Sequence, residues 1–267
     1  MPKTAIVTGG TGVLGLALVR GLCRRLGDDG VVYLTARDPD RGRQAVDLLR
    51  REGLAPRLEP FELGDAASAR ALADTVADRH GGVDILIAGA ASRIELGVRN
   101  QDQVRAFVDA NNHGTHRLID AFAPLLDDGA RFVLVTGVLG GLRHIPHRLR
   151  PRFDVEHATL DDLAAVMDDY VRAVEDGRAA AEGWPAWIDV PSMIGRVAAV
   201  KILARDLGAE AVRRDIVVNA ACVPPTDRDA DPTRAAADVL RLATLPPGSR
   251  TPYAQLVRNR TAIPFHA

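Results

Sequence analysis

A glycine-rich turn near the start of the chain is the first group of residues whose spacing suggests chemistry. Gly9, Gly12 and Gly15 follow a β-rich run at 4–8 and open a helical pattern at 13–26. In such a turn the first glycine allows the tight bend, the second lets the backbone approach a pyrophosphate, and the third lets helix and strand pack closely. The free N–H groups and the positive helix end suit an anion. The pattern predicts a dinucleotide-binding turn, with a vestigial turn as the alternative, and its candidate contacts are Thr8, Gly9, Thr11, Gly12, Val13, Leu14 and Gly15.

The end of the second β-rich run bears on which dinucleotide would bind. An acid there accepts a hydrogen bond from the ribose 2′-hydroxyl of NAD, whereas an arginine suits a 2′-phosphate. The run at 31–35 leads into Arg37, with Arg41 nearby, which favours NADP(H); the alternative is a solvated surface arginine. Further candidate cofactor contacts are Glu62, Leu63, Ala88 and Gly89.

The elements that must position these residues alternate along the first half of the chain. The β-rich runs lie at 4–8, 31–35, 84–88 and 131–136, and the helical patterns near 13–26, 39–52, 66–79 and 101–126. A later helix near 190–207 and a strand at 214–220 extend the pattern. Nearly continuous apolar strands separated by helices imply a parallel sheet covered on both faces. We therefore predict an α/β fold, a Rossmann-like doubly wound parallel sheet in a single domain over 1–267.

Residues 142–183 interrupt the alternation. A basic, proline-containing stretch is followed by a helical pattern from about 160 to 177, and Thr159 with Asp162 resembles a capping box. An apolar stripe runs along this helix through Leu160, Leu163, Met167, Tyr170, Val171 and Val174. We interpret the segment as a helical insertion that packs on the domain, with a mobile lid as the alternative.

Composition excludes several classes of protein. The formal net charge is −1, which argues against nucleic acid as a partner because phosphate binding needs a basic excess. Cys23 and Cys222 stand in apolar runs without C-x-x-C spacing, as expected of thiols in a reducing cytosol. No leader-like start and no apolar run of 18 residues is found, so we expect a cytoplasmic protein without a membrane span.

The chain resembles the short-chain dehydrogenases/reductases, and more narrowly their monomeric carbonyl reductases. The resemblance spans nearly the whole chain, and several of its stretches are specific. They are the glycine turn, YLTARDPDRGRQAV at 33–46, LRREGLAPR at 49–57, HGGVDILI at 80–87, NNHGT at 111–115, EGWP at 182–185, VVNAAC at 217–222 and LPP at 245–247. The glycine spacing itself is that of the extended members of the superfamily. In the carbonyl reductases the insertion covers the surface that other members use for dimers, so the resemblance implies a monomer.

The same resemblance implies a catalytic set of Ser, Tyr and Lys with a supporting Asn. The lysine stands four residues after the tyrosine, lowers its pKa and holds the nicotinamide ribose, while the tyrosine passes a proton to the substrate oxygen. Here that register places Asp189 at the tyrosine position, Met193 at the lysine position and Gly137, preceded by Thr136, at the serine position. Asn111 keeps the expected type. The family's Asn-Asn-Ala-Gly reads Ala-Gly-Ala-Ala at 88–91, and its Pro-Gly reads Val-Pro at 223–224.

A shift of alignment does not restore the pair. Lys3 and Lys201 are the only lysines, and neither stands four residues after a tyrosine. The sequence therefore predicts that ordinary carbonyl reduction is lost. NADP(H) is expected to bind, if at all, through its adenosine-phosphate half, as a structural ligand.

Asp189 is the strongest candidate for new acid/base chemistry. A poorly solvated carboxyl has a raised pKa and can act as a general acid, or as a base when ionised. The alternative is that Asp189 caps a helix starting at 190, with Pro191 in its first turn. His113 and His144 are candidate partners, with surface roles as the alternative, and their spacing does not predict a metal site. Trp184 and Trp187 suit either a large hydrophobic substrate or core packing.

Three functions are compatible with these residues. The first is a non-redox or redirected enzyme that performs cyclisation, aldol, dehydration or isomerisation chemistry on an apolar, carbonyl-containing small molecule, with Asp189 as acid/base and Asn111, Thr136 and the histidines in support. The second is an NADPH-dependent carbonyl reductase with a substituted proton donor. The third is a non-catalytic binding or accessory protein.

Overall fold

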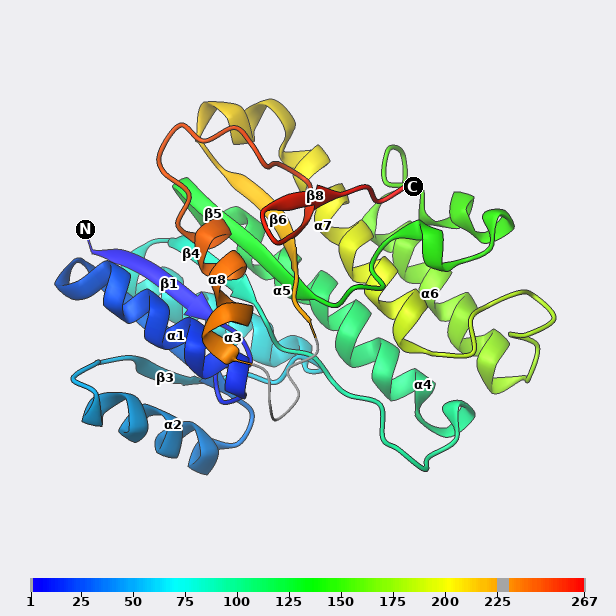
Figure 1. Ribbon diagram of the computed structural model, residues 1–267, viewed down its shortest axis with the longest axis horizontal. Helices are drawn as coiled ribbons and strands as arrows, with labels where there is room; N and C mark the ends of the chain where they lie inside the picture. The colour runs from blue at the N-terminus through cyan, green and yellow to red at the C-terminus, as the bar shows by residue number, and fades with distance from the viewer. Residues whose placement is uncertain (1, 225–230, 267) are drawn as a thin grey trace.

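The computed structural model describes residues 2–224 and 231–266. Within them one sheet forms in the order β3-β2-β1-β4-β5-β6-β7-β8 (Figure 1). All neighbouring strands are parallel except the β7–β8 hairpin, which is antiparallel. The strands are β1 Lys3–Val7, β2 Gly30–Ala36, β3 Arg57–Pro60, β4 Val83–Ala88, β5 Leu126–Thr136, β6 Val217–Cys222, β7 Leu256–Arg258 and β8 Thr261–Ile263.

Helices cover both faces of the sheet, because successive residues of each strand point to opposite sides. In β1, Ala5 and Val7 pack into a core with α1, α2 and α8, whereas Ile6 packs into a second core with α3 to α7. The α/β doubly wound fold is thereby confirmed. The helices are α1 Val13–Leu26, α2 Pro39–Arg51, α3 Ala66–His80, α4 Asn100–Val108, α5 Gly114–Phe122, α6 Leu160–Glu175, α7 Asp189–Arg213 and α8 Pro232–Ala243.

The helix expected over 101–126 is interrupted. A π-helical turn at Asp109–His113 separates α4 from α5, and the Gly114 N–H donates to the Asp109 carbonyl five residues back. Four further elements escaped prediction, namely β3 in the first half of the chain and α8, β7 and β8 near its end. The β strands among them are three or four residues long and carry no clear alternation of burial.

The insertion between β5 and α7 packs on the domain through α6 (Figure 1). The capping box is present, since Thr159 accepts from the Asp162 N–H and Asp162 accepts from the Thr159 N–H. Its apolar stripe faces inward, with Leu163, Met167 and Tyr170 fully buried against α4 and α7. Trp184 is also buried, whereas Trp187 is 71% exposed.

Candidate functional site

The glycine turn presents an open helix end at the carboxyl edge of β1. Gly9 has φ +73°, a conformation that glycine adopts at no steric cost. A Cβ on Gly15 would overlap the Gly9 carbonyl oxygen, so only glycine lets α1 approach this closely. Helix α1 has no side-chain cap and no acid in its first turn, and Gly12 and Val13 are exposed. The Gly12 N–H donates to the Gly9 carbonyl at 3.3 Å within the turn. The N–H groups of the first turn of α1, beginning at Val13, have no intrahelical acceptor and are available to an anion.

The turn is held against the end of β4 by Thr8. The Thr8 hydroxyl accepts from the N–H groups of Gly89 and Ala90, both at 3.0 Å. A Cβ on Gly89 would lie 2.8 Å from the Thr8 carbonyl oxygen, which explains glycine at this position. Ala88 is buried at the strand end. Thr8, Ala88 and Gly89 were predicted as cofactor contacts. Thr8 and Ala88 are almost fully buried, so these three residues shape the turn.

Directly after β2 lies an exposed cation, Arg37, which forms an ion pair with Glu62. The Arg37 side chain is 80% exposed, and its Nε lies 3.4 Å from Glu62 Oε2. Asp38 caps α2 by accepting from the N–H groups of Asp40 and Arg41. Leu63 is buried against Gly114. An exposed guanidinium beside an uncapped helix end fits the 2′-phosphate and pyrophosphate of NADP(H).

Asp189 lies in the first turn of α7, and the alternative interpretation, that it caps this helix, is wrong. The helix begins at Asp189 itself, Ile188 precedes it in helical geometry, and the Asp189 side chain makes no capping hydrogen bond. Burial raises the pKa of the half-buried Asp189 carboxyl above its usual range. Burial, and secondarily the Asp189 charge, raises the pKa of Tyr170. The buried Tyr170 hydroxyl has no hydrogen-bond partner among the described residues.

The π-helical turn supplies two asparagines to this end of the sheet. Asn111 Oδ1 accepts from the Ser92 N–H at 2.8 Å, and Asn111 Nδ2 donates to the Ser92 carbonyl at 3.2 Å. The neighbouring Asn112 makes a reciprocal pair with Ser192, three residues after Asp189. Nothing in the residue pattern distinguished Asn112 or Ser192. The pair fixes the first turn of α7 against the turn that carries Asn111.

The loop after β5 meets α7 at Met193. A Cβ on Gly137 would lie 3.0 Å from both the sulfur and the methyl carbon of Met193, so the thioether fills this space. The Thr136 hydroxyl, at the strand end, is buried and has no partner in the described part of the chain. No hydrogen bond of the described residues joins Asp189 directly to Asn111 or Thr136.

The two candidate histidines have different surroundings. His113 Nε2 lies 3.0 Å from Asp168 Oδ1 on α6, and its ring stands edge-on to His116, so it ties the insertion to α5. His144 lies in the loop after β5, beside the Val138 carbonyl. Burial, and the nearby Arg143, lower the pKa of His144. Residues 2–224 and 231–266 contain no cluster of His, Cys, Asp or Glu that could hold a metal.

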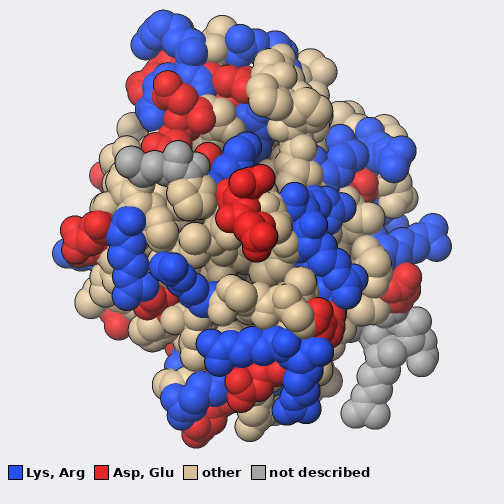
Figure 2. All heavy atoms as spheres, turned by 90° about the vertical axis from the view of Figure 1, so that its left-hand side faces the viewer, with Lys and Arg blue, Asp and Glu red and all other residues tan. Residues whose placement is uncertain are grey.

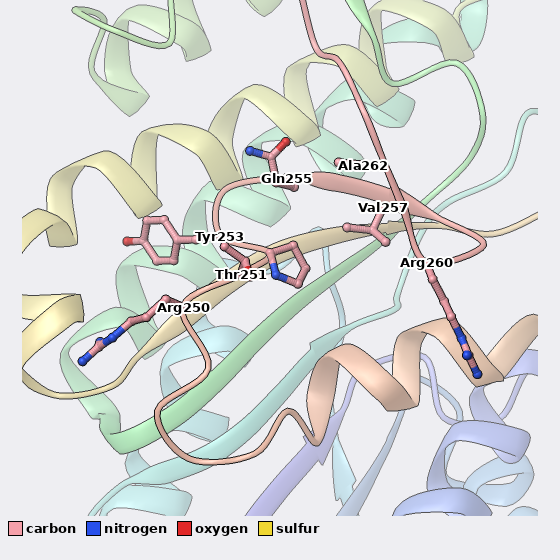
Figure 3. Close-up of a pocket in the computed structure, with 8 residues that line it drawn as sticks. Arg250, Thr251, Tyr253, Gln255, Val257, Arg260 and Ala262 are labelled. Carbon is pink, nitrogen blue, oxygen red and sulfur yellow. The ribbon is translucent and has the colours of Figure 1, made fainter.

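A cavity of about 430 Å³ lies elsewhere, beside the β7–β8 hairpin (Figure 3). Tyr253 points from its wall toward α7 and donates to the Ala204 carbonyl. None of the predicted site residues lines it. This open pocket is lined by Arg250, Thr251, Pro252, Tyr253, Gln255, Val257, Arg260 and Ala262.

A parallel sheet with an open glycine turn beside its central strands defines a Rossmann-type nucleotide-binding fold. Residues 3–147 match the short chain dehydrogenase family, and the chain belongs to this family. It is 32% identical over 267 residues to carbonyl reductase [NADPH] 1 of Homo sapiens, covering 96% of each chain. It is 32% identical over 269 residues to carbonyl reductase [NADPH] 3 of Rattus norvegicus, covering 97% of this chain and 96% of that one.

Solved structures share the fold. Menthone neomenthol reductase from Mentha piperita superposes with a TM-score of 0.80 at 22% identity, over 96% of this chain and 98% of that one. Salutaridine reductase from Papaver somniferum superposes with a TM-score of 0.81 at 19% identity, over 94% of this chain and 98% of that one. No helix within the described ranges combines the length and apolarity that a membrane span requires.

Proposed function

We propose that the protein is an NADP(H)-dependent reductase of carbonyl-containing small molecules that uses Asp189 as its proton donor. The observation that carries this proposal is the uncapped end of α1 beside the exposed Arg37, a combination suited to NADP(H). The two carbonyl reductases to which this chain is 32% identical carry NADPH in their names. This is the second of the three functions that the sequence allowed.

The bound cofactor would supply a hydride to the substrate's carbonyl carbon. As that bond forms, the Asp189 carboxyl would give its proton to the carbonyl oxygen, and the products would be an alcohol, the oxidised cofactor NADP⁺ and an Asp189 carboxylate. The carboxylate regains a proton from water, which reaches this half-exposed side chain. Burial favours the protonated carboxyl, so the donor form persists closer to neutral pH than in a solvated aspartate.

Neighbouring residues hold the substrate region in place. Asn111 fixes the loop after β4 through its two hydrogen bonds to the backbone of Ser92. The exposed Trp187 and Leu96 lie on segments linked by the Asn100 side chain, which donates to the Ala186 carbonyl. Such apolar side chains suit a hydrophobic substrate.

The test combines binding with turnover. Purified protein is titrated with NADPH and 2′,5′-ADP, and NADPH oxidation is followed with a panel of aldehydes and quinones. We expect both ligands to bind, and Asp189→Asn to lower turnover at least 100-fold without loss of NADPH binding. Absence of NADPH binding, or full activity of Asp189→Asn, contradicts the proposal.

A second candidate is acid/base chemistry without hydride transfer, centred on the same carboxyl. The Met193 thioether favours it, because an apolar group fills the space beside Gly137 and supplies no charge to a ribose or a phenol. Product formation from an enolisable carbonyl compound, with no NADPH consumed and with dependence on Asp189, would support this candidate over the reductase. A protein in which pocket substitutions alter neither binding nor turnover would instead be non-catalytic.

A further inference from the structure

Arg196, on α7, is a buried cation that the proposed reaction has not used. It is 5% exposed. Its Nε donates to the Thr115 hydroxyl and its Nη2 donates to the Ala90 carbonyl, both at 3.1 Å. Both acceptors are neutral, and no ion pair joins Arg196 to an acid within residues 2–224 and 231–266. Burial lowers the pKa of Arg196 to about 10, which leaves the guanidinium charged at neutral pH.

This charge lies between the two ends of the candidate site. Ala90 touches the glycine turn, since a Cβ on Gly9 would lie 3.0 Å from the Ala90 Cα. On the other side, the Thr115 hydroxyl donates to the Asn111 carbonyl at 2.6 Å. A dinucleotide that extends from the turn across the end of β4 would therefore run close to Ala90, whose carbonyl Arg196 contacts.

A buried charge without a counter-ion acts strongly on its surroundings, because the dielectric constant around it is low. Its burial costs folding free energy, which indicates that a ligand or a function depends on the charge. The oxidised nicotinamide ring carries a positive charge, whereas the reduced ring is neutral. A fixed cation at the nicotinamide end of the site would repel the oxidised form and leave the neutral reduced form unaffected.

We propose that Arg196 makes the site selective for NADPH over NADP⁺. The proposal rests on NADP(H) binding as argued above. It assigns to Arg196 a specificity-determining role at the nicotinamide end, while the adenosine end is recognised by the glycine turn and Arg37. Reduced cofactor then binds preferentially, and the oxidised product is released.

The experiment measures dissociation constants for NADPH, NADP⁺ and 2′,5′-ADP by calorimetry, in wild type, Arg196→Met and Arg196→Lys. We expect wild type to prefer NADPH over NADP⁺. Arg196→Met should shrink that preference about tenfold, which corresponds to ~1.4 kcal/mol, and Arg196→Lys should retain it. Affinity for 2′,5′-ADP, which lacks the nicotinamide, should stay within about twofold.

Lys201→Met is the matched control. Lys201 is another partly buried cation of α7 that donates to a backbone carbonyl, but it does so at Ala254 and faces the Phe265 ring. Its removal should leave the ratio of NADPH to NADP⁺ affinity unchanged. The ratio of NADPH to NADP⁺ affinity is measured within one variant, so partial unfolding of Arg196→Met does not alter it. Arg196→Gln provides a second neutral variant.

Each other result overturns the proposal. Equal wild-type affinity for NADPH and NADP⁺ removes the selectivity, and an unchanged ratio in Arg196→Met removes the role of the charge. Parallel loss of affinity for all three ligands means that Arg196 only supports the fold. If wild type binds none of the three, NADP(H) binding itself fails and the selectivity falls with it.

Discussion

Asp189 is subject to two physical effects of opposite sign. The N–H groups at the start of α7 favour its carboxylate form, whereas half-burial beside Ile188 and Val190 penalises it. The pKa of Asp189 is raised, with desolvation as the cause, so burial outweighs the helix end. A residue in the first turn of a helix can thus be an acid rather than a cap, and the proposed proton donor depends on this balance.

The same balance makes a stability prediction for Asp189→Asn. Because the folded-state pKa exceeds the unfolded value, the ionised carboxyl costs stability above both pKa values, and the cost disappears as pH falls below the unfolded value of about 3.9. Solvent screens part of the effect at this half-exposed site. We expect the variant's Tm to exceed that of wild type by about 1–2 °C at pH 8 and the gap to shrink toward pH 4.

Thermal unfolding from pH 4 to pH 8 measures this difference. Asp161→Asn, an exposed acid in the first turn of α6, is the matched control and should bring no gain at pH 8. A variant less stable than wild type at pH 8 would show that the Asp189 carboxylate is stabilised in the fold, and the raised pKa would be refuted.

His116 makes the opposite prediction at low pH. It is 7% exposed, and burial, with smaller contributions from His113 and Arg117, lowers its pKa to about 4. Between the unfolded value of about 6.5 and this folded value, only the unfolded chain binds a proton, so stability falls as pH falls. We expect wild type to lose roughly 2–4 kcal/mol of unfolding free energy from this group between pH 7 and pH 4.

His116→Gln should lack that part of the acid sensitivity, because glutamine does not titrate. Urea unfolding of both proteins at pH 7, 5.5 and 4 gives the comparison. Parallel loss of stability in wild type and variant would mean that His116 titrates normally in the folded protein.

The role of a single residue could be predicted from the sequence where it depends on the residue's immediate neighbours in the chain. Gly9, Gly15 and the Thr159 capping box are set by backbone geometry within a few residues, and the structure has them as predicted. The cap expected at Asp189 was wrong because Ile188 already adopts helical geometry. Arg196 was missed because burial depends on contacts with Ala90 and Thr115, about 80 to 106 residues away in sequence.

At the scale of elements, strong periodicity was predictable and its interruptions were not. Helices α1 and α2 lie within one residue of their predicted bounds. The break between α4 and α5 has no sequence signature such as proline, because it arises from a local shift of the backbone hydrogen bonds to the fifth residue back. That break presents Asn111 and Asn112 toward the site, so a local irregularity places functional groups that the regular pattern would misplace.

The glycine turn offers a paired prediction for its element. A Cβ on Gly12 meets only ordinary contact with the Gly9 carbonyl, whereas a Cβ on Gly15 overlaps it. Gly12→Ala should therefore keep the wild-type Tm but weaken NADPH and 2′,5′-ADP binding by about tenfold or more, because the methyl group obstructs the pyrophosphate. Gly15→Ala should lower the unfolding free energy by about 1–3 kcal/mol through overpacking.

Calorimetry and thermal unfolding on both variants separate the two roles. Gly12→Ala with unchanged affinity for both ligands would show that the turn does not approach a pyrophosphate. Gly15→Ala with wild-type stability would show that α1 can move away from β1 at no cost.

At the scale of the whole molecule, surface charges are mixed and the apolar face of the insertion helix is covered by its own chain. Figure 2 shows acidic and basic side chains interspersed over the face that carries α1 and α2. Ion pairs such as Arg20 with Glu52 contribute to this mixing. Helix α6 is joined to α4 by the bidentate pair of Arg105 and Glu175, so the insertion is held by charge at its rim and by apolar packing beneath. Such an arrangement leaves α4 and α7 covered by their own chain.

The covered helices lead to a prediction about assembly. The apolar stripe of α6 is buried, while Asp161, Asp162 and Arg172 on its outer side are exposed and charged. A dimer through this face would have to desolvate those charges without a compensating apolar core. We expect sedimentation velocity to give a single species of 28.6 kDa between about 1 and 100 μM.

Met167→Ala, which removes a buried contact of α6, should cost about 2–4 kcal/mol of stability and leave that mass unchanged. A mass that doubles with concentration in wild type would place an interface on another face, and doubling in Met167→Ala alone would show that α6 masks one.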